Sequence, residues 1–381
     1  MEKRIYLDNN ATTAVDRRVV QAMLPYFSEI YGNPSSVHAF GRETREAVEK
    51  AREVVARCLN ASPDEIFFTS CGTESDNFAI RGVAFELREK GNHIITSAIE
   101  HSAVIKTVKD LANYGFEFTI LPVDKFGMVD PDEFRKAIKP NTILATIMLA
   151  NNEIGTIQPI KELVEIAHEH GVIFHTDAVQ GVGKMKVDVQ ELGVDLLSLS
   201  GHKFYAPKGV GALYIRKGTP IRTIQTGGGH ERGMRSGTEN VPGIVGLGEA
   251  CRLTIEELDA RNERIKRLRD KLEDAILSNP DLDAELNGHP EHRVVNTLNI
   301  LFRGINAGEA VLEFDKRGVA VSAASACHAK TIAPSHVLLA IGRDPEEAYS
   351  SIRFSLGKDN TEEEIDYVIS IIPEVIEASK M

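Results

Sequence analysis

Lys203 is the residue with the clearest chemical potential in this sequence. It lies in the segment SLSGHKFYAPKGVG, residues 198–211, directly after an apolar run. Lysine is rarely buried without a partner, because removing an ammonium group from water is costly. A desolvated lysine has a lowered pKa and can attack a carbonyl to form a Schiff base. A lysine on a solvated loop is the alternative, and this segment alone does not exclude it.

Two further segments could bind parts of a ligand. In TSCGTES, residues 69–75, Gly72 permits close backbone approach, and Thr73 with the N-terminus of a following helix favours an anion. In HTDAVQ, residues 175–180, Asp177 can hold a cationic ring nitrogen, and Gln180 lies one helical turn further on. Each segment also fits an ordinary N-capped helix start.

His101 follows the apolar run NHIITS and begins a helical pattern. A lone histidine is more often a helix cap or a satisfied core group than a catalyst. Its position at the end of a predicted strand places it with the other polar clusters.

The elements that would position these clusters are short apolar runs alternating with helical patterns between about residues 60 and 216. This alternation predicts a mostly parallel sheet covered by helices on both faces. Ligands bind at the carboxyl ends of the strands in such sheets. All four clusters follow predicted strands, so we expect them to share one edge.

A second, smaller α+β domain is expected beyond a long charged helix at about residues 244–278. The runs VVNTLNILF and AYSSIRFSL predict strands there. Thr361 and Glu364 form a capping box before a C-terminal helix.

Together the clusters provide an anion cradle, a carboxylate, a hydrogen-bond donor, an imidazole and an amine. These groups match the needs of the phosphate, ring nitrogen, phenolate oxygen, ring face and aldehyde of pyridoxal 5′-phosphate. We therefore expect this cofactor, with Lys203 joined to its aldehyde as an imine.

Composition restricts the partners. The chain has 381 residues, a formal net charge of −12 and a pI of about 5.5, so it offers no basic footprint for nucleic acid or anionic lipid. No segment has the apolar length of a membrane helix or the core of a signal peptide, which predicts a cytoplasmic protein. Its four cysteines are far apart and form no CxxC pair, so a disulfide framework or cysteine zinc site is not expected, and neither is any other metal site.

The sequence resembles the cysteine desulfurases of the NifS/IscS type, which have the aminotransferase-like fold of pyridoxal phosphate enzymes. The resemblance covers nearly the whole chain. Its motifs are YLDNNATT at 6–13, YGNPSSVH at 31–38, ANNEIGTIQPI at 150–160, HTDAVQ at 175–180, SGHKFYAPKGVGALY at 200–214, GGGHERGMRSGTEN at 227–240, SACHA at 325–329 and SSIRFSLG at 350–357.

The fold implied by this resemblance is α/β. A large domain, residues 13–257, would contain a mostly parallel seven-stranded sheet. Residues 1–12 with 258–381 would form the small domain that carries the active-site cysteine loop.

The resemblance also implies roles for individual residues. Lys203 would bind the cofactor and move protons, Asp177 would pair with the pyridine nitrogen, Gln180 would contact the phenolate oxygen and His101 would stack on the ring. Asn152 and Arg353 would hold the substrate carboxylate. The phosphate would be bound by Gly72, Thr73, Ser200 and His202, with Thr238 reaching over from a second subunit of a homodimer.

The implied reaction removes sulfur from L-cysteine, releases L-alanine and leaves a persulfide on Cys327. An iron–sulfur scaffold or another sulfur-acceptor protein would then take the sulfur. Small residues around Cys327, and the basic neighbours His328 and Lys330, suit a mobile thiolate better than a buried structural cysteine.

Rival interpretations remain at this stage. A selenocysteine lyase or an aminotransferase would share the fold and cofactor, although an aminotransferase would not need Cys327. A non-catalytic sulfur-transfer scaffold would not need Lys203, Asp177 and His101. Cys71, beside the anion cradle, departs from the family pattern and has no assigned role.

Overall fold

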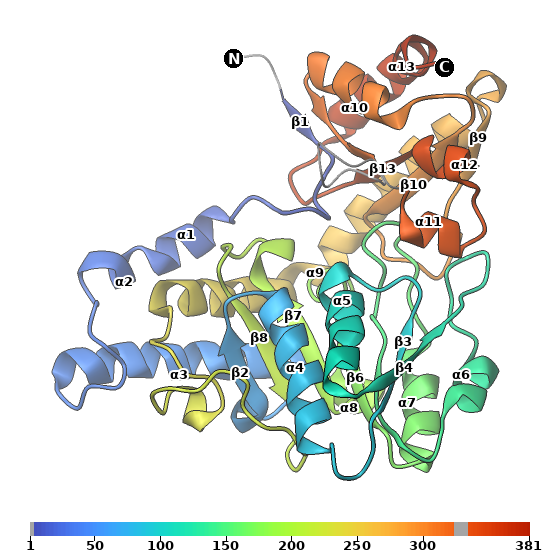
Figure 1. Ribbon diagram of the computed structural model, residues 1–381. Coiled ribbons are helices and arrows are strands. Elements are labelled where there is room, and N and C mark those ends of the chain that lie inside the picture. The colour runs from blue at the N-terminus through green and yellow to red at the C-terminus, as the bar shows by residue number, and fades with distance from the viewer. Residues whose placement is uncertain (1–3, 324–333) are drawn as a thin grey trace.

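The computed structural model describes residues 4–323 and 334–381. Figure 1 shows two groups of elements, a larger one built on a wide sheet and a smaller one that contains both chain ends. Within the described residues, no helix combines the length and apolar character required to cross a bilayer.

The large sheet has seven strands, as expected from the resemblance. β8 is antiparallel to both of its neighbours, and the other six strands run parallel to one another. Its order is β2 (Ile66–Thr69), β8 (Gly211–Ile215), β7 (Leu196–Ser200), β6 (Ile173–Asp177), β5 (Thr142–Thr146), β3 (His93–Ser97) and β4 (Glu117–Leu121).

Helices cover both faces of this sheet because its strands are apolar on both sides. Within β7, Leu196 belongs to one apolar cluster and Leu197 and Leu199 to another. α4 (Gly72–Glu86) and α5 (Ser102–Leu111) pack on the first face. The second face is covered by α3 (Ala39–Leu59), α6 (Pro131–Ala137), α7 (Ile160–Glu169) and the first part of α9 (Val241–Leu277). The short helices α1 (Arg17–Met23), α2 (Pro25–Ser28) and α8 (Val189–Leu192) complete this region.

A four-stranded antiparallel sheet forms the centre of the smaller group. Its order is β12 (Ser322–Ala323), β13 (Ser351–Ser355), β10 (Thr297–Phe302) and β9 (Ala284–Leu286). The N-terminal strand β1 (Ile5–Tyr6) pairs in parallel with β11 (Val319–Ala320). The helices here are α10 (Ala307–Lys316), α11 (His336–Ala340), α12 (Pro345–Tyr349) and α13 (Glu362–Ala378).

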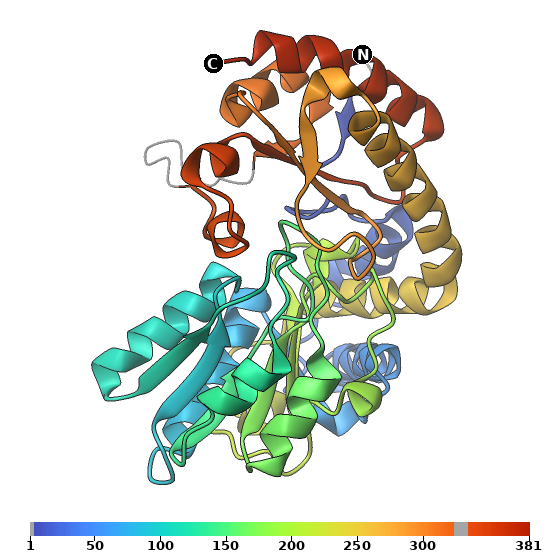
Figure 2. The same cartoon turned by 90° about the vertical axis from the view of Figure 1, so that its right-hand side faces the viewer.

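α9 connects the two groups and is visible as the long helix at the right of Figure 2. Its residues up to Leu253 belong to the core of the large sheet, whereas Ile265 to Ile276 belong to the core of the small one. Ile5 and Leu7 also join the small core. The boundaries predicted at residues 12 and 257 stay a prediction, and this division of apolar contacts supports them.

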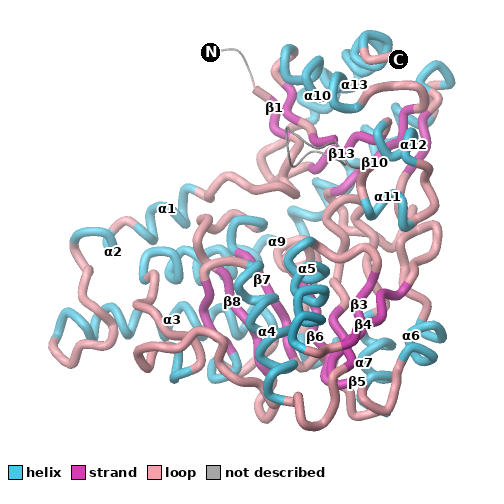
Figure 3. The backbone as a smooth tube through the Cα atoms, in the orientation of Figure 1, coloured by secondary structure: helices cyan, strands magenta, loops and turns pink. Residues whose placement is uncertain are grey.

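Local signals explain individual helix ends. The predicted capping box of α13 is present: Glu364 N donates to Thr361 Oγ1 at 3.3 Å, and Thr361 N donates to Glu364 Oε2 at 3.3 Å. α9 begins with Pro242 in its first turn, where a missing N–H costs nothing. Figure 3 shows that loops gather between the two groups of strands.

Candidate functional site

The carboxyl ends of neighbouring strands bring the predicted clusters to one edge of the large sheet. β6 ends at Asp177 and β7 ends at Ser200, with these two strands paired. β2 and β3 end at Thr69 and Ser97, just before the segments that carry Gly72 and His101. The sheet topology therefore places these side chains in one region.

Lys203 closes a 3₁₀ turn, Gly201–Lys203, that follows β7. Its Nζ donates to the carbonyl oxygens of Asn10 and Ala11, both at 2.8 Å. The side chain is half-buried. Lys203 is therefore not a free lysine on a solvated loop, because its amine contacts the N-terminal segment. It is not fully enclosed either, because part of the residue remains accessible to solvent.

The start of α4 and the end of β7 form a cradle for an anion. A Cβ atom on Gly72 would lie 2.8 Å from Val179 Cγ2, so a side chain at this position would be blocked. Ser200 Oγ is 3.9 Å from that Cβ position, is buried, and has no hydrogen-bond partner among the described residues. Buried hydroxyls are normally bonded, so Ser200 is a donor ready for a ligand.

The helix dipole adds to this cradle because Gly72 and Thr73 are the first residues of α4. Cys71 occupies the N-cap position without making a side-chain capping bond. Thr73 is exposed. These features fit a phosphate group, and they contradict the simple alternative of a helix start satisfied by its own cap.

The loop before α9 is held close to this helix start. Arg235 Nε donates to Glu74 Oε1 at 2.6 Å and Arg235 Nη2 donates to Glu74 Oε2 at 3.1 Å. Thr238 follows three residues later and is exposed. Sequence reasoning missed this ion pair, and the predicted reach of Thr238 into a second subunit remains a prediction.

His202 contributes a neutral imidazole. Its Nδ1 lies 3.1 Å from Thr12 Oγ1, and its backbone carbonyl accepts from Thr13 N at 2.9 Å. Burial, with a smaller contribution from the positive charge of Lys203, lowers the pKa of His202 to about 4. The side chain is therefore uncharged at neutral pH.

Asp177 is a buried carboxylate, with 5% of its surface exposed. Its Oδ1 accepts from Val179 N at 2.9 Å, so it does make the local turn bond that the alternative interpretation predicted. Burial raises the pKa of Asp177, and interactions with the neighbouring His101 and Lys203 oppose that rise. A cationic ring nitrogen beside the carboxylate would offset its desolvation.

A polar layer that the sequence did not reveal lies next to Asp177. Asp76 and His175 are both buried, with Asp76 Oδ1 3.8 Å from His175 Nε2. Burial, with the charge of Asp177, raises the pKa of Asp76 well above its usual range. Burial lowers the pKa of His175 to about 3. The layer therefore favours a proton on Asp76 and a neutral His175.

His101 is the N-cap of α5, as the cap interpretation predicted. Its Nδ1 accepts from Ala103 N at 3.1 Å, which leaves the proton of the neutral ring on Nε2. Loss of hydration lowers the pKa of His101, although the residue keeps contact with solvent and the nearby Asp177 carboxylate opposes the shift. The cap role and a role in the site are compatible, because they use different edges of the ring.

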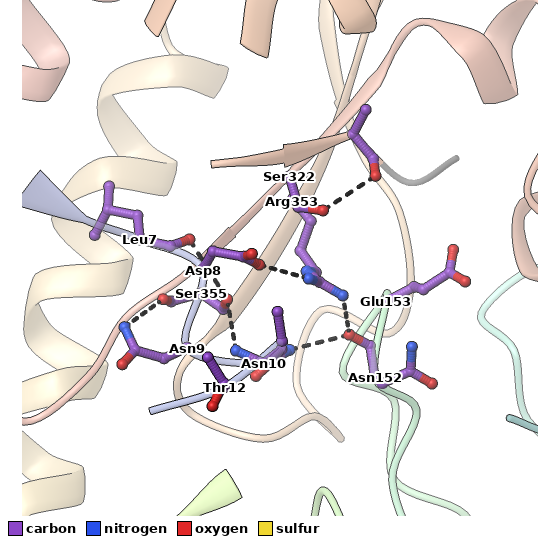
Figure 4. Close-up of polar contacts among 12 residues, drawn as sticks. Leu7, Asp8, Asn9, Asn10, Thr12, Asn152, Glu153, Ser322, Arg353 and Ser355 are labelled. Atoms are coloured by element: carbon purple, nitrogen blue, oxygen red, sulfur yellow. Dashed lines mark hydrogen bonds and ion pairs between the residues drawn. The ribbon is translucent and has the colours of Figure 1, made fainter. Parts of the chain in front are cut away.

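Arg353 and Asn152 lie together, as Figure 4 shows. Arg353 Nη2 donates to Asp8 Oδ1 at 2.7 Å and its Nη1 donates to the backbone oxygen of Asn152 at 2.9 Å. Arg353 Nε has no partner among the described residues. The guanidinium group thus already binds one carboxylate, and Asp8 was not among the predicted site residues, although it belongs to the quoted motif YLDNNATT.

Cys327 lies outside the described residues, as do its basic neighbours His328 and Lys330. The chain on either side of this gap contacts the site. Ser322 is paired with Arg353 across β12 and β13. Ser335 Oγ donates to Glu153 Oε2 at 2.5 Å, and His336 Nε2 donates to the carbonyl oxygen of Glu100 at 2.9 Å.

Gln180 is buried, and both ends of its amide make a hydrogen bond. Nε2 donates to the carbonyl oxygen of Asn10 at 3.0 Å, and Oε1 accepts from Lys184 Nζ. Lys184 and Asn10 were not among the predicted site residues.

Comparisons with known proteins show the family of this chain. The family model of aminotransferase class-V matches residues 5–368. The cysteine desulfurase IscS of Methanosarcina thermophila is 52% identical over 375 residues, which cover 98% of this chain and 92% of that protein. The enzyme of the same name from Dictyoglomus turgidum is 52% identical over 377 residues, 99% of this chain and 95% of that protein. A solved structure of a NifS-like protein superposes with a TM-score of 0.93 at 43% identity and covers 99% of this chain and 100% of its own.

Proposed function

Since this chain belongs to the aminotransferase class-V family and is a pyridoxal-phosphate-dependent cysteine desulfurase, we propose that Lys203 holds the cofactor and that Cys327 receives the sulfur of L-cysteine. The observation that carries the first assignment is the shared strand edge. It brings together the Lys203 amine, the Asp177 carboxylate and the Ser200 hydroxyl, which has no hydrogen-bond partner among the described residues.

The residues of this edge fit the groups of the cofactor. Gly72, Thr73, Ser200 and His202 would bind the phosphate, with Thr238 supplied by a second subunit. Asp177 would bind the ring nitrogen, Gln180 the phenolate oxygen and His101 the ring face. When bound, pyridoxal phosphate supplies an electrophilic carbonyl and an electron sink for a substrate carbanion.

Protein groups would bind and deprotonate the substrate. Arg353 presents a planar fork that matches a carboxylate, and Asn152 lies beside it. To bind L-cysteine, Arg353 would exchange Asp8 for the substrate carboxylate. Lys203 Nζ would take the α-proton, and His101 would use Nε2 for proton transfer near the departing sulfur because Ala103 N occupies Nδ1.

Sulfur transfer balances without an external oxidant. The Cys327 thiolate attacks the substrate sulfur, so an S–S bond forms as the carbon–sulfur bond breaks. The electron pair of the broken bond stays with the substrate carbon, which takes a proton and leaves as alanine. Cys327 keeps the persulfide, and an iron–sulfur scaffold or another acceptor protein in the cytoplasm would take its outer sulfur.

Mass spectrometry after exposure to L-cysteine tests the role of Cys327. We expect one additional sulfur on the peptide that contains Cys327. Cys327→Ala should abolish release of alanine from L-cysteine while the visible absorption of the cofactor remains, and Cys58→Ala is the matched control. An unmodified peptide, or retained turnover in Cys327→Ala, would refute the assignment.

We also propose that a second copy of the chain covers an exposed apolar surface near α2. Its members are large apolar side chains with 52–83% exposure: Leu24, Phe27, Tyr31, Val37 and Phe40. In Figure 1 this region lies at the left, on the side away from the small sheet. Sedimentation should show a dimer that Phe27→Glu weakens, whereas Tyr114→Glu at a separate exposed ring should leave the dimer intact.

A further inference from the structure

Lys184 is a second buried lysine at the site. It lies in the turn after β6 with 7% of its surface exposed, and it lines the same narrow cavity as Lys203. Its Nζ donates to Asn10 Oδ1 at 2.6 Å and to Gln180 Oε1. Burial lowers its pKa well below the usual range, and the positive charges of Lys203 and Arg353 add to that effect. Burial of an amine costs desolvation free energy, and both contacts of this amine lie inside the site. We therefore expect Lys184 to have a role there.

The contact with Lys184 fixes the orientation of the Gln180 amide. Gln180 Oε1 faces the Lys184 amine, and Gln180 Nε2 donates to the carbonyl oxygen of Asn10 at 3.0 Å. With the amide reversed, its oxygen would face a carbonyl oxygen and its NH₂ group would face an amine donor. The contact between the two oxygens would be repulsive, and Gln180 would lose the bond that Lys184 donates to its oxygen, so the environment favours the observed orientation.

In this orientation the NH₂ group of Gln180 contacts the same oxygen atom as the Lys203 amine. The carbonyl oxygen of Asn10 accepts from Gln180 Nε2 at 3.0 Å and from Lys203 Nζ at 2.8 Å. Two donors that share one acceptor lie next to each other. The second hydrogen of the Gln180 amide is therefore available to an acceptor near the Lys203 nitrogen.

Asn10 is held rigidly enough to serve as the reference point of this arrangement. Its Oδ1 also accepts from Asn296 Nδ2 at 3.0 Å, and its Nδ2 donates to Thr297 Oγ1 at 2.8 Å. Its backbone N donates to Ser355 Oγ at 2.9 Å, a contact visible in Figure 4. Asn10 thus ties the small sheet to the lysine pair.

We propose that Lys184 is a positioning residue that aims the Gln180 amide at the phenolate oxygen of the cofactor joined to Lys203. This inference rests on the proposed attachment of the cofactor to Lys203. A hydrogen-bond donor at the phenolate oxygen disperses the negative charge of that oxygen. The oxygen then stabilises a proton on the adjacent Lys203 nitrogen less strongly. Loss of the donor therefore raises the pKa of that nitrogen.

Among the described residues, several titratable groups surround the network, and two of them, Tyr205 and Arg261, line the same cavity as Lys184. Lys203 faces Asp177 and His101, and Arg353 faces Lys184 while paired with Asp8. Substitution of Lys184 leaves the contacts of Asp177 and His101 in place. A change in the titration of the cofactor then comes either from the Gln180 contact or from removal of the Lys184 amine itself, and the double variant described below separates these two causes.

The test is a pH titration of the visible absorption band in purified holoenzyme. Lys184→Met keeps the apolar stem and removes both donated bonds, so we expect the midpoint to rise by about one pH unit. Gln180→Leu should raise it similarly. The double variant should match Gln180→Leu, because Lys184 has nothing left to orient. Lys184→Gln, which keeps a donor, should shift the midpoint less and serves if Lys184→Met does not fold.

Lys186→Met is the matched control, because Lys186 is exposed and pairs with Glu191 at the surface. Its midpoint should equal that of the wild type. An unchanged midpoint in a folded Lys184 variant, or a double variant whose shift is the sum of the two single shifts, would overturn the proposal. Either result leaves the attachment to Lys203 intact, whereas a visible band that persists in Lys203→Ala would refute the proposed function itself.

Discussion

The two sides of the site are prepared differently. On the side of the large sheet, Ser200 Oγ is unpartnered among the described residues and Asp177 is a buried carboxylate, so both have capacity for a ligand. On the side of the small sheet, Arg353 already donates to Asp8 and Asn152. The first side suits a resident cofactor, which needs fixed groups. The second suits a substrate that enters and leaves, because an existing ion pair can be exchanged for each new carboxylate.

The largest effect is expected from Lys203→Ala on the cofactor side. Loss of the amine removes both the attachment point and the proton carrier, so turnover of L-cysteine should fall by at least about a thousandfold. The visible absorption of the cofactor should also disappear. Lys208→Ala, five residues later on an exposed turn, should behave as the wild type. A Lys203→Ala enzyme that kept both its turnover and its visible absorption would show that the large-sheet side does not hold the cofactor through Lys203.

Arg353→Lys tests the substrate side. Lysine keeps the charge but lacks the fork, and a lost charge-assisted hydrogen bond is worth about 1.5–3 kcal/mol. We expect KM for L-cysteine to rise about 10- to 100-fold with an unchanged visible spectrum. Arg303→Lys, at the surface, provides the control. A changed spectrum with constant KM would place Arg353 on the cofactor side instead.

Asp8→Asn tests whether Arg353 exchanges Asp8 for the substrate carboxylate, and we expect a smaller change in KM than for Arg353→Lys. The amide keeps the shape of the side chain and removes the charge that competes with the substrate carboxylate. KM for L-cysteine should therefore fall about two- to fivefold. If KM rises, Asp8 orients Arg353 and the exchange model is wrong.

Glu100 provides a pH test of the buried side. It is fully buried, and burial raises its pKa to about 8 despite bonds from Ser97 Oγ and Met148 N to Oε1. Because the folded pKa exceeds the unfolded value, the folded protein holds a proton that the unfolded chain releases. Glu100 therefore lowers stability as pH rises from about 4.5 to 8.

Glu100→Gln cannot lose this proton. Its melting temperature relative to the wild type should increase by about 2 °C or more between pH 5.5 and 8.5, measured by calorimetry of the holoenzyme. A difference that stays constant with pH would mean that Glu100 is ionised in the folded protein throughout this range.

The sequence predicted the strands that build the cofactor side because their apolar runs are continuous. β7 is buried throughout and β6 is buried after its first residue, and the two strands end at Ser200 and Asp177. The edge strand β4 was not predicted, since it begins with exposed Glu117 and has no apolar run. The antiparallel direction of β8 has no local signal either.

The same contrast explains which site residues were missed. Asp177 is the last residue of β6 and Lys203 lies just after β7, so local sequence and the strand-edge rule place them together. Asp8 and Asn10 act through partners far away in the chain: Asn10 is separated from Thr297 by 287 positions and Asp8 from Arg353 by 345. Lys184, in GVGKMKVD, looks like an ordinary surface lysine. The only available signal was the motif YLDNNATT, which marked Asp8 and Asn10 as part of a pattern without giving their contacts.

Borohydride reduction of the purified protein, followed by peptide mass spectrometry, tests the central claim most directly. Reduction converts an imine into a stable amine, so the cofactor should be found on the peptide that contains Lys203 and on no other lysine. A pyridoxyl phosphate on Lys184 or on a surface lysine, with an unmodified Lys203 peptide, would contradict the account.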